Sequence, residues 1–144
     1  MVSLGRRSRS NVSKSRPVVF RRDRHECVVA GLFEAYRWPC AGGLTVQHRR
    51  GRGMGGSANW DDAECLVAMC AAHNVLETAD ADFKKVCLRF GWSVPRWVAD
   101  QYALSRIPVR YADGYFLLSG DGRYSISDKT ATTLIEEIYG SLFE

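Results

Sequence analysis

The chain has 144 residues, which is enough for one domain with a modest hydrophobic core, and it contains no apolar run near the roughly 20 residues of a membrane-spanning helix. Its net charge of +4 is unevenly spread: residues 1–60 hold 12 Lys/Arg and 3 Asp/Glu, whereas the rest hold 8 and 13. This pattern indicates a surface for a polyanion such as nucleic acid, the alternative being a solvated basic tail without a partner.

The first 17 residues are basic and rich in serine, and they offer almost nothing to bury. The sequence therefore predicts a disordered arm over residues 1–17. This stretch lacks the apolar segment of a secretory signal, so we expect the protein in the cytoplasm of the cell that makes it. In that reducing compartment, the five cysteines favour metal binding or buried thiols over disulfides.

A short strand is predicted over residues 44–48, where apolar and polar side chains alternate. Four glycines within residues 51–56 make the next segment a loop. The run Asp-Asp-Ala-Glu at 61–64 is a helix-start signal before further apolar residues, and residues 73–90 carry apolar side chains at helical spacing up to Gly91. A strand, a loop and a helix are therefore expected one after another in this part of the chain.

The pattern changes after Trp92. Residues 107–111 and 115–118 flank Ala-Asp-Gly and predict a β-hairpin, because Asp-Gly favours a tight type I′ turn. A last helix is predicted from Ser127 or Asp128 to Leu142, with its apolar residues on one stripe. We therefore expect three parts: the arm, a core over 18–92, and a small C-terminal α/β extension over 93–144.

Four residues form a candidate metal site: Cys27, Cys40, Cys70 and His73. Zinc prefers tetrahedral sulfur and nitrogen ligands, and a Cys-x-x-His pair where a turn meets a helix is a common half-site. A domain this small would gain folding free energy from such a site. The alternative is that the cysteines are small buried hydrophobes, and this is the better interpretation of Cys87, which lies on the apolar stripe of the predicted helix.

Three stretches of the chain belong together: RDRHEC at 22–27, LTVQHRRGRGMGG at 44–56 and LVAMCAAHN at 66–74. They resemble the HNH endonucleases, a family of ββα-metal nucleases, and especially those encoded by actinobacterial phages. The resemblance covers about residues 20–118, since 91–96 and 107–110 are also similar to the segment C-terminal to the nuclease core in those proteins. It implies an α+β fold in which a zinc-stabilised ββα-metal (HNH) core carries a C-terminal β-hairpin and helix.

The resemblance also implies a chemistry, the hydrolysis of DNA phosphodiester bonds with one divalent ion, Mg²⁺ or Mn²⁺. It implies that His48 is the general base that deprotonates the attacking water. It implies that Gln47 and Asn74 are ligands of the catalytic ion. Cys65 takes the place of the family's middle asparagine, which orients the site through backbone hydrogen bonds.

The residue types at this site support the same chemistry independently of the family. A neutral imidazole has a pKa near 6.5 and suits proton removal from water, although a histidine at a strand end can equally be a structural one. The glycines can equally belong to a flexible loop. Three arginines next to His48 are expected to contact DNA phosphates: Arg49, Arg50 and Arg52.

Three functions are compatible with these observations. The first is a phage-encoded HNH endonuclease that acts on double-stranded DNA in the cytoplasm of a bacterial host cell. The second is a DNA-binding protein of the same fold with weakened catalysis, because Gln47 and Asn74 bring no charge to a metal ion and Cys65 replaces an asparagine. The third is a zinc-stabilised interaction protein, for example a partner of a DNA-packaging terminase, with the acidic C-terminal half as its docking surface.

Overall fold

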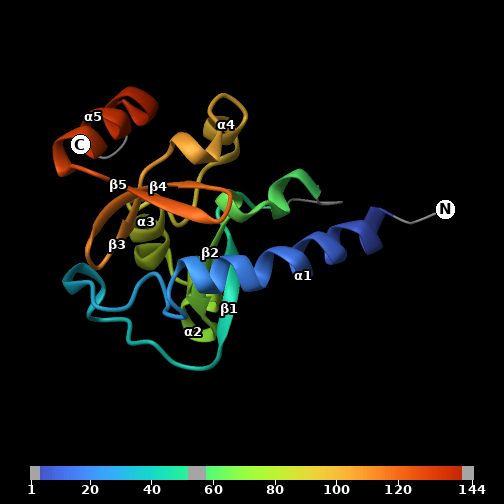
Figure 1. Cartoon of the computed structure of the whole chain (residues 1–144). Coiled ribbons are helices and arrows are strands. Elements are labelled where there is room, and N and C mark those ends of the chain that lie inside the picture. Colours follow the sequence, from blue (N-terminus) through green and yellow to red (C-terminus); the bar gives the residue numbers. More distant parts are fainter. Residues whose placement is uncertain (1–3, 52–57, 141–144) are drawn as a thin grey trace.

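The computed structural model describes the backbone of residues 4–51 and 58–140, and the side chains of 12–51 and 60–140. It is a mixed α+β fold with two small antiparallel sheets, so the α+β class that the sequence predicts is confirmed (Figure 1). No helix in these ranges combines the length and apolar character of a membrane span. The elements are α1 (Leu4–Arg22), β1 (Leu44–His48), β2 (Leu66–Cys70), α2 (Ala71–Ala79), α3 (Ala81–Arg89), α4 (Arg96–Ala99), β3 (Val109–Tyr111), β4 (Gly114–Ser119), β5 (Gly122–Ile126) and α5 (Asp128–Tyr139).

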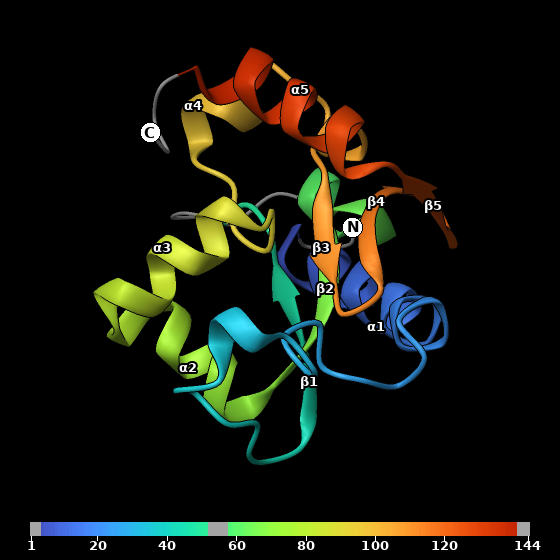
Figure 2. The same ribbon diagram turned by 90° about the vertical axis from the view of Figure 1, so that its left-hand side faces the viewer.

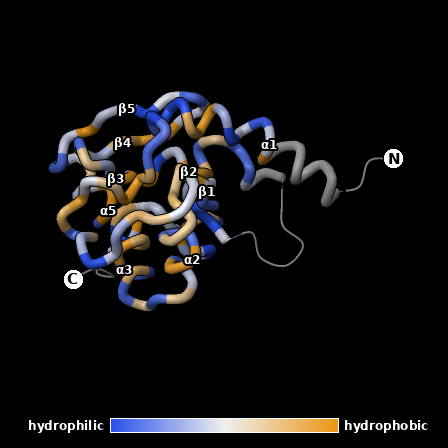
Figure 3. Tube along the Cα trace, turned by 90° about the horizontal axis from the view of Figure 1, so that it is seen from below, coloured by the Kyte–Doolittle hydropathy of each residue, from blue (hydrophilic) through white to orange (hydrophobic). Residues whose placement is uncertain are grey.

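The first sheet pairs β1 with β2, and α2 begins directly after β2. Strand β1 lies where the alternation predicted it. The helix-start signal at 61–64 is misleading, because it forms two short 3-10 turns, η2 (Ala58–Asp61) and η3 (Ala63–Cys65), and a strand comes next. All five residues of β2 are buried and apolar, which suits a short strand covered on both faces (Figure 3). The N–H of Val28 donates a hydrogen bond to the carbonyl of Ala68, so the segment around Val28 lies along the edge of β2 that is not paired with β1.

The single helix predicted over 73–90 is two helices, α2 and α3, which meet at Asp80. The Asp80 backbone is extended, with φ −124° and ψ 116°, and its side chain caps α3 by accepting a hydrogen bond from the N–H of Phe83. Gly91 comes after α3 with φ +77°, and a Cβ there would lie 2.0 Å from the carbonyl oxygen of Pro108. This glycine therefore allows the chain to turn and the later segment to approach closely.

The second sheet has the order β3-β4-β5. The predicted hairpin is confirmed, but its turn differs from the predicted type I′ Asp-Gly turn. Tyr111 pairs with Gly114, so the two loop residues are Ala112 and Asp113, and Asp113 does not have the positive φ of that turn type. A further turn adds β5, which the sequence did not predict. Helix α5 begins at the predicted cap, since the Ser127 hydroxyl accepts a hydrogen bond from the N–H of Thr130. The helix ends at Tyr139 and not at the predicted Leu142, because Gly140 has a non-helical backbone with φ 60° and ψ −130°. Leu142 itself lies outside the described residues. Figure 2 shows α5 lying beyond one end of this sheet.

Residues 4–22 are helical, where the sequence predicted a disordered arm over 1–17. The first turns of α1 extend away from the rest of the molecule, while its last turns pack on it (Figure 1). Buried Val19 contacts the apolar face of β2. Tertiary packing of this kind stabilises a helix whose own sequence would not suffice.

A buried ion pair fixes the end of α1. The guanidinium of Arg22 donates to the carboxylate of Asp23 at 2.8 Å and to the carbonyls of Ala63 and Leu66. The Asp23 carboxylate also accepts hydrogen bonds from the N–H of Ala68 and the hydroxyl of Tyr111. Arg22 and Asp23, the first two residues of the stretch 22–27, thus join α1, β2 and β3.

The predicted boundary between residues 92 and 93 does not separate the packing. One core cluster contains side chains from the loop before β1, from β2 and α3, and from β3 and β4. The C-terminal hairpin therefore completes the core around Cys27 and Cys70, two of the candidate metal ligands. The members of this core cluster include Val28, Leu32, Val67, Met69, Phe83, Trp92, Val109, Phe116 and Leu118.

Candidate functional site

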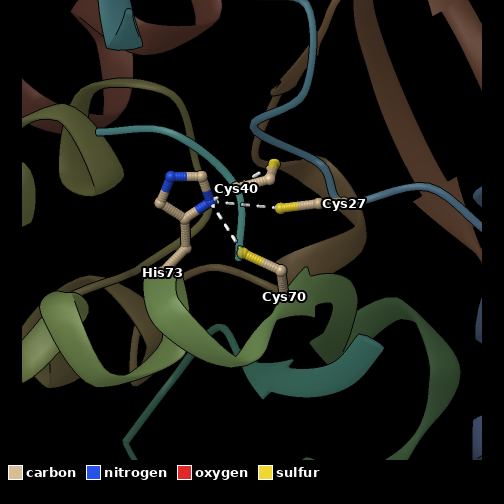
Figure 4. A group of neighbouring side chains, drawn as sticks. All are labelled: Cys27, Cys40, Cys70 and His73. Carbon is tan, nitrogen blue, oxygen red and sulfur yellow. Dashed lines mark hydrogen bonds between the residues drawn. The ribbon is translucent and has the colours of Figure 1, made fainter. Parts of the chain in front are cut away.

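Three parts of the chain bring the four predicted metal ligands together (Figure 4). Cys27 lies just after the sharp turn that ends α1, where two residues other than glycine have a positive φ. Cys40 belongs to the loop before β1. Cys70 ends β2, and His73 lies in the first turn of α2. The prediction that these four residues form one group is confirmed.

The donor atoms have the spacing of a tetrahedral metal site. The Nδ1 of His73 lies 3.2 Å from the sulfur of Cys70, 3.4 Å from that of Cys27 and 3.8 Å from that of Cys40. All four donor atoms lie within 4.8 Å of one another. Zinc bonds of about 2.3 Å to sulfur and about 2.0–2.1 Å to nitrogen place such atoms about 3.6 Å apart. The group could therefore hold a metal such as zinc.

Contacts around His73 give its ring the tautomer that a metal ligand needs. Its Nε2 lies 2.5 Å from the carbonyl oxygen of Trp38, which can only accept, so Nε2 carries the proton. The lone pair of Nδ1 then faces the three sulfurs. The ring also stacks on Phe83, with centroids 5.1 Å apart, and this contact fixes its orientation. A hydrogen bond from the second ring nitrogen, like that of His73 to Trp38, is typical of histidine ligands of metal ions.

The thiols of the group differ in how easily they ionise. Burial raises the pKa of Cys27 to about 12, and burial also raises the pKa of Cys40. Burial acts in the same direction on Cys70, but hydrogen bonds from the backbone N–H groups of His73 and Ala41 and from the thiols of Cys27 and Cys40 together outweigh it, and the pKa of Cys70 is lowered. A bound cation would stabilise all three thiolates, because metal binding displaces the thiol protons. Cys87 is buried outside the group, as predicted.

A second candidate site is a cleft of about 470 Å³ between β1 and α2. It brings together Gln47, His48 and Asn74, which the resemblance to HNH endonucleases assigns to catalysis. Their proximity results from the strand pairing, since α2 folds back against β1 directly after β2. The cleft is lined by Val46, Gln47, His48, Gly51, Asn74, Val75, Glu77 and Thr78.

His48 has a hydrogen-bond partner that the sequence did not predict. Its Nε2 lies 2.8 Å from Oδ1 of Asp61, a carboxylate with 0% of its surface exposed. A carboxylate only accepts, so Nε2 donates and Nδ1 keeps its lone pair. Asp61 belongs to the acidic run that we interpreted as a helix start. The sequence signal that could have identified Asp61 as the partner of His48 is its position, an acidic residue in the connection between two paired strands.

The two amide side chains of the cleft differ in their contacts. The Nδ2 of Asn74 donates to the hydroxyl of Thr45 at 2.7 Å and to the carbonyl of Val46 at 3.1 Å, which leaves its oxygen as an acceptor. Gln47 is only 6% exposed. A residue that sequence reasoning missed is Glu77, which is 7% exposed, lines the same cleft and pairs with Lys84 on α3.

Cys65 does not contribute its side chain to the cleft. It packs in a separate apolar cluster with Val94, Val98 and Leu104, and burial raises its pKa to about 12. Its carbonyl accepts a hydrogen bond from the N–H of Arg49, which extends the pairing of β1 and β2 by one residue beyond His48. The assignment of Cys65 to the catalytic residues is therefore corrected to a backbone contact and core packing.

Arg49 is a structural residue and not a phosphate contact. It is 1% exposed, and its guanidinium donates to the carbonyls of four residues at 2.8–2.9 Å. Burial lowers its pKa to about 10. Arg50 stacks over Trp60 and lies 3.4 Å from the carboxylate of Asp100, and Arg52 lies outside the described residues. The four carbonyls that accept hydrogen bonds from Arg49 belong to Glu64, Gly91, Leu104 and Ile107.

The two sites mark opposite ends of one strand pair. The register places Cys70 opposite Leu44 at the end with the metal-ligating group, and His48 opposite Leu66 at the other end. Such an arrangement can combine a structural metal with an acid–base residue in an open cleft. Comparison with family models, with curated proteins and with solved structures found no match for this chain.

Proposed function

We propose that this protein is an HNH-type endonuclease that hydrolyses phosphodiester bonds of DNA. The observation that carries the proposal is the cleft between β1 and α2, in which His48, Gln47 and Asn74 come together. Support also comes from the strand–strand–helix order of β1, β2 and α2, with a possible metal group at its other end. These features agree with the roles that the resemblance to HNH endonucleases implies for the same residues.

The proposed role of Cys27, Cys40, Cys70 and His73 is to hold a structural zinc ion. The four ligands come from the turn after α1, the loop before β1 and the junction of β2 with α2. A metal there would join these segments and so contribute to folding free energy. It would also fix the first turn of α2, and thereby Asn74 in the cleft.

The proposed catalytic ion is Mg²⁺ or Mn²⁺, held by the amide oxygens of Gln47 and Asn74. Oxygen donors of this kind suit a hard divalent cation, and the hydrogen bonds of Asn74 leave its oxygen for that purpose. When bound, such an ion stabilises negative charge on the phosphate and on the leaving oxygen.

His48 is the proposed general base, and Asp61 determines which of its atoms acts. Because the Nε2–H of His48 donates to the Asp61 carboxylate, Nδ1 is the atom that accepts a proton from water. The buried carboxylate then stabilises the imidazolium that forms. Asp61 thus positions the ring and offsets its charge.

The proposed DNA surface includes α1. Lys14, Arg16 and Arg21 are exposed on this helix, and α1 contains no acidic residue. The hydroxyl of Ser15 donates to the carbonyl of Asp61 at 2.7 Å, so α1 lies against the turn that carries the partner of His48. Basic side chains at that position would bind the phosphates of a duplex that reaches the cleft.

The test is a nicking assay on supercoiled plasmid with Mn²⁺, Mg²⁺ or EDTA. We expect metal-dependent nicking, and His48→Ala should lose on the order of 10²–10⁴ in rate while it still binds DNA. His25→Asn is the matched control, because His25 is exposed outside the cleft and asparagine tolerates its positive φ of 56°. Equal activity of the wild type and His48→Ala would overturn the proposal, and DNA binding without nicking would support the weakened-catalysis alternative.

A further inference from the structure

We propose that Glu77 is the carboxylate ligand of the divalent-ion site in the cleft, beside the amide oxygens of Gln47 and Asn74. This inference rests on the proposed function and adds a ligand that the HNH-like stretches do not contain. Two neutral amides alone bring no charge to a hard cation, which usually has at least one carboxylate ligand. Glu77 would supply that missing charge.

The position of Glu77 on α2 suits this role. Asn74 and Glu77 are three residues apart on one helix, so their side chains share a face, and both line the cleft. Burial of this carboxylate inside a polar cleft requires a cationic partner. Gln47 reaches the same space from β1, on the opposite wall.

Gln47 lines the cleft from the strand that faces α2, and only 6% of its surface is exposed. Its amide oxygen is a neutral donor of the kind that a hard divalent ion accepts as a ligand. A bound cation would contact this oxygen together with the Glu77 carboxylate.

Lys84 explains how a buried carboxylate persists without a bound cation. Its ammonium group pairs with the Glu77 carboxylate from α3, and the Lys84 side chain is only partly buried. An ammonium group on a flexible, partly exposed stem can leave when a divalent ion arrives. We therefore expect Lys84 and the divalent ion to compete for the same carboxylate.

The experiment is a Mn²⁺ titration of the full chain, purified without chelator and monitored by the electron paramagnetic resonance signal of free Mn²⁺. Glu77→Gln should weaken Mn²⁺ binding by about tenfold or more, whereas Lys84→Gln should strengthen it severalfold. Glu77→Asp keeps the charge and should retain more affinity than Glu77→Gln. Asp82→Asn is the matched control, because this exposed carboxylate on α3 pairs only at the surface with Arg37, and it should bind Mn²⁺ like the wild type.

Glu77→Gln and Lys84→Gln are expected to change the Mn²⁺ affinity in opposite directions, and this difference distinguishes a metal ligand from a purely structural ion pair. If the pair is structural, both Glu77→Gln and Lys84→Gln lower the melting temperature and neither alters the Mn²⁺ affinity of the folded protein, which would overturn the inference. Plasmid nicking, measured in parallel, keeps the two proposals distinct. Wild-type nicking with an unchanged affinity in Glu77→Gln contradicts this ligand alone. Loss of Mn²⁺ affinity in Glu77→Gln without nicking by the wild type supports the ligand and contradicts the nuclease.

Discussion

The carboxylate of Asp61 lies 2.8 Å from the Nε2 of His48, at the end of the strand pair opposite the candidate metal ligands. Asp61 is fully buried, whereas the His48 side chain is partly exposed to the cleft. The pair therefore has one end that water cannot reach and one end that a substrate can. This arrangement leads to the first prediction.

Asp61→Asn should lower the nicking rate by on the order of 10² or more while DNA binding persists. An asparagine can present its oxygen or its NH₂ group to His48 and cannot offset the charge of an imidazolium, so the ring loses both its preferred tautomer and its stabilisation. Nitrogen NMR of the imidazole should show the proton on Nε2 in the wild type and a changed tautomer in the variant. Asp62→Asn, the exposed neighbour, is the control and should behave like the wild type.

The metal-ligating group should contain about one zinc ion per chain by elemental analysis. Cys70→Ser removes the ligand whose thiolate is best stabilised, and we expect it to lose most of the zinc and to melt at a lower temperature. Cys87→Ser changes a buried thiol outside the group and should leave the zinc content unaltered. A protein that melts at the same temperature with and without chelator would contradict a structural metal.

Arg49→Lys should destabilise the protein by on the order of 3 kcal/mol, because an ammonium group cannot satisfy four carbonyls that a planar guanidinium reaches together. Urea unfolding measures this loss. The partly exposed Arg50 is the control, and Arg50→Lys should cost far less. A stable Arg49→Lys protein with weaker DNA binding would restore Arg49 to the phosphate contacts.

Local patterns predicted those parts of the fold that local chemistry determines. The alternation at Leu44–His48 sufficed for β1, and the Ser127 cap for the start of α5. The two runs around Ala112–Gly114 sufficed for the hairpin, although the turn itself is one residue earlier than the predicted Asp-Gly turn. The metal-ligating group was predicted from residue types and one close pair, because few residues other than cysteine and histidine suit zinc. In each case the residues that decide the structure lie within a few positions, or have little alternative chemistry.

The remaining features depend on contacts between distant segments. Helix α1 is held by the buried Arg22–Asp23 pair and its bonds to β2, and nothing within residues 4–17 indicates this. The run at 66–70 is apolar throughout, so its period could not distinguish a strand from a buried helix. Asp61 and Glu77 are acidic residues among many, and only the folded chain shows that they are buried beside His48 and Asn74.

The last prediction concerns α1 and DNA. Replacement of Lys14, Arg16 and Arg21 by glutamine should reduce the slope of log affinity against log salt concentration by about 2.7, since each phosphate contact contributes about 0.9. The three residues are exposed on a helix that touches the turn carrying Asp61, so their loss should weaken binding without changing the cleft. Fluorescence anisotropy of a labelled duplex at several salt concentrations measures the slope. Lys129→Gln, an exposed change on α5, should leave it unaltered, and equal slopes for the wild type and the triple variant would exclude α1 from the DNA surface.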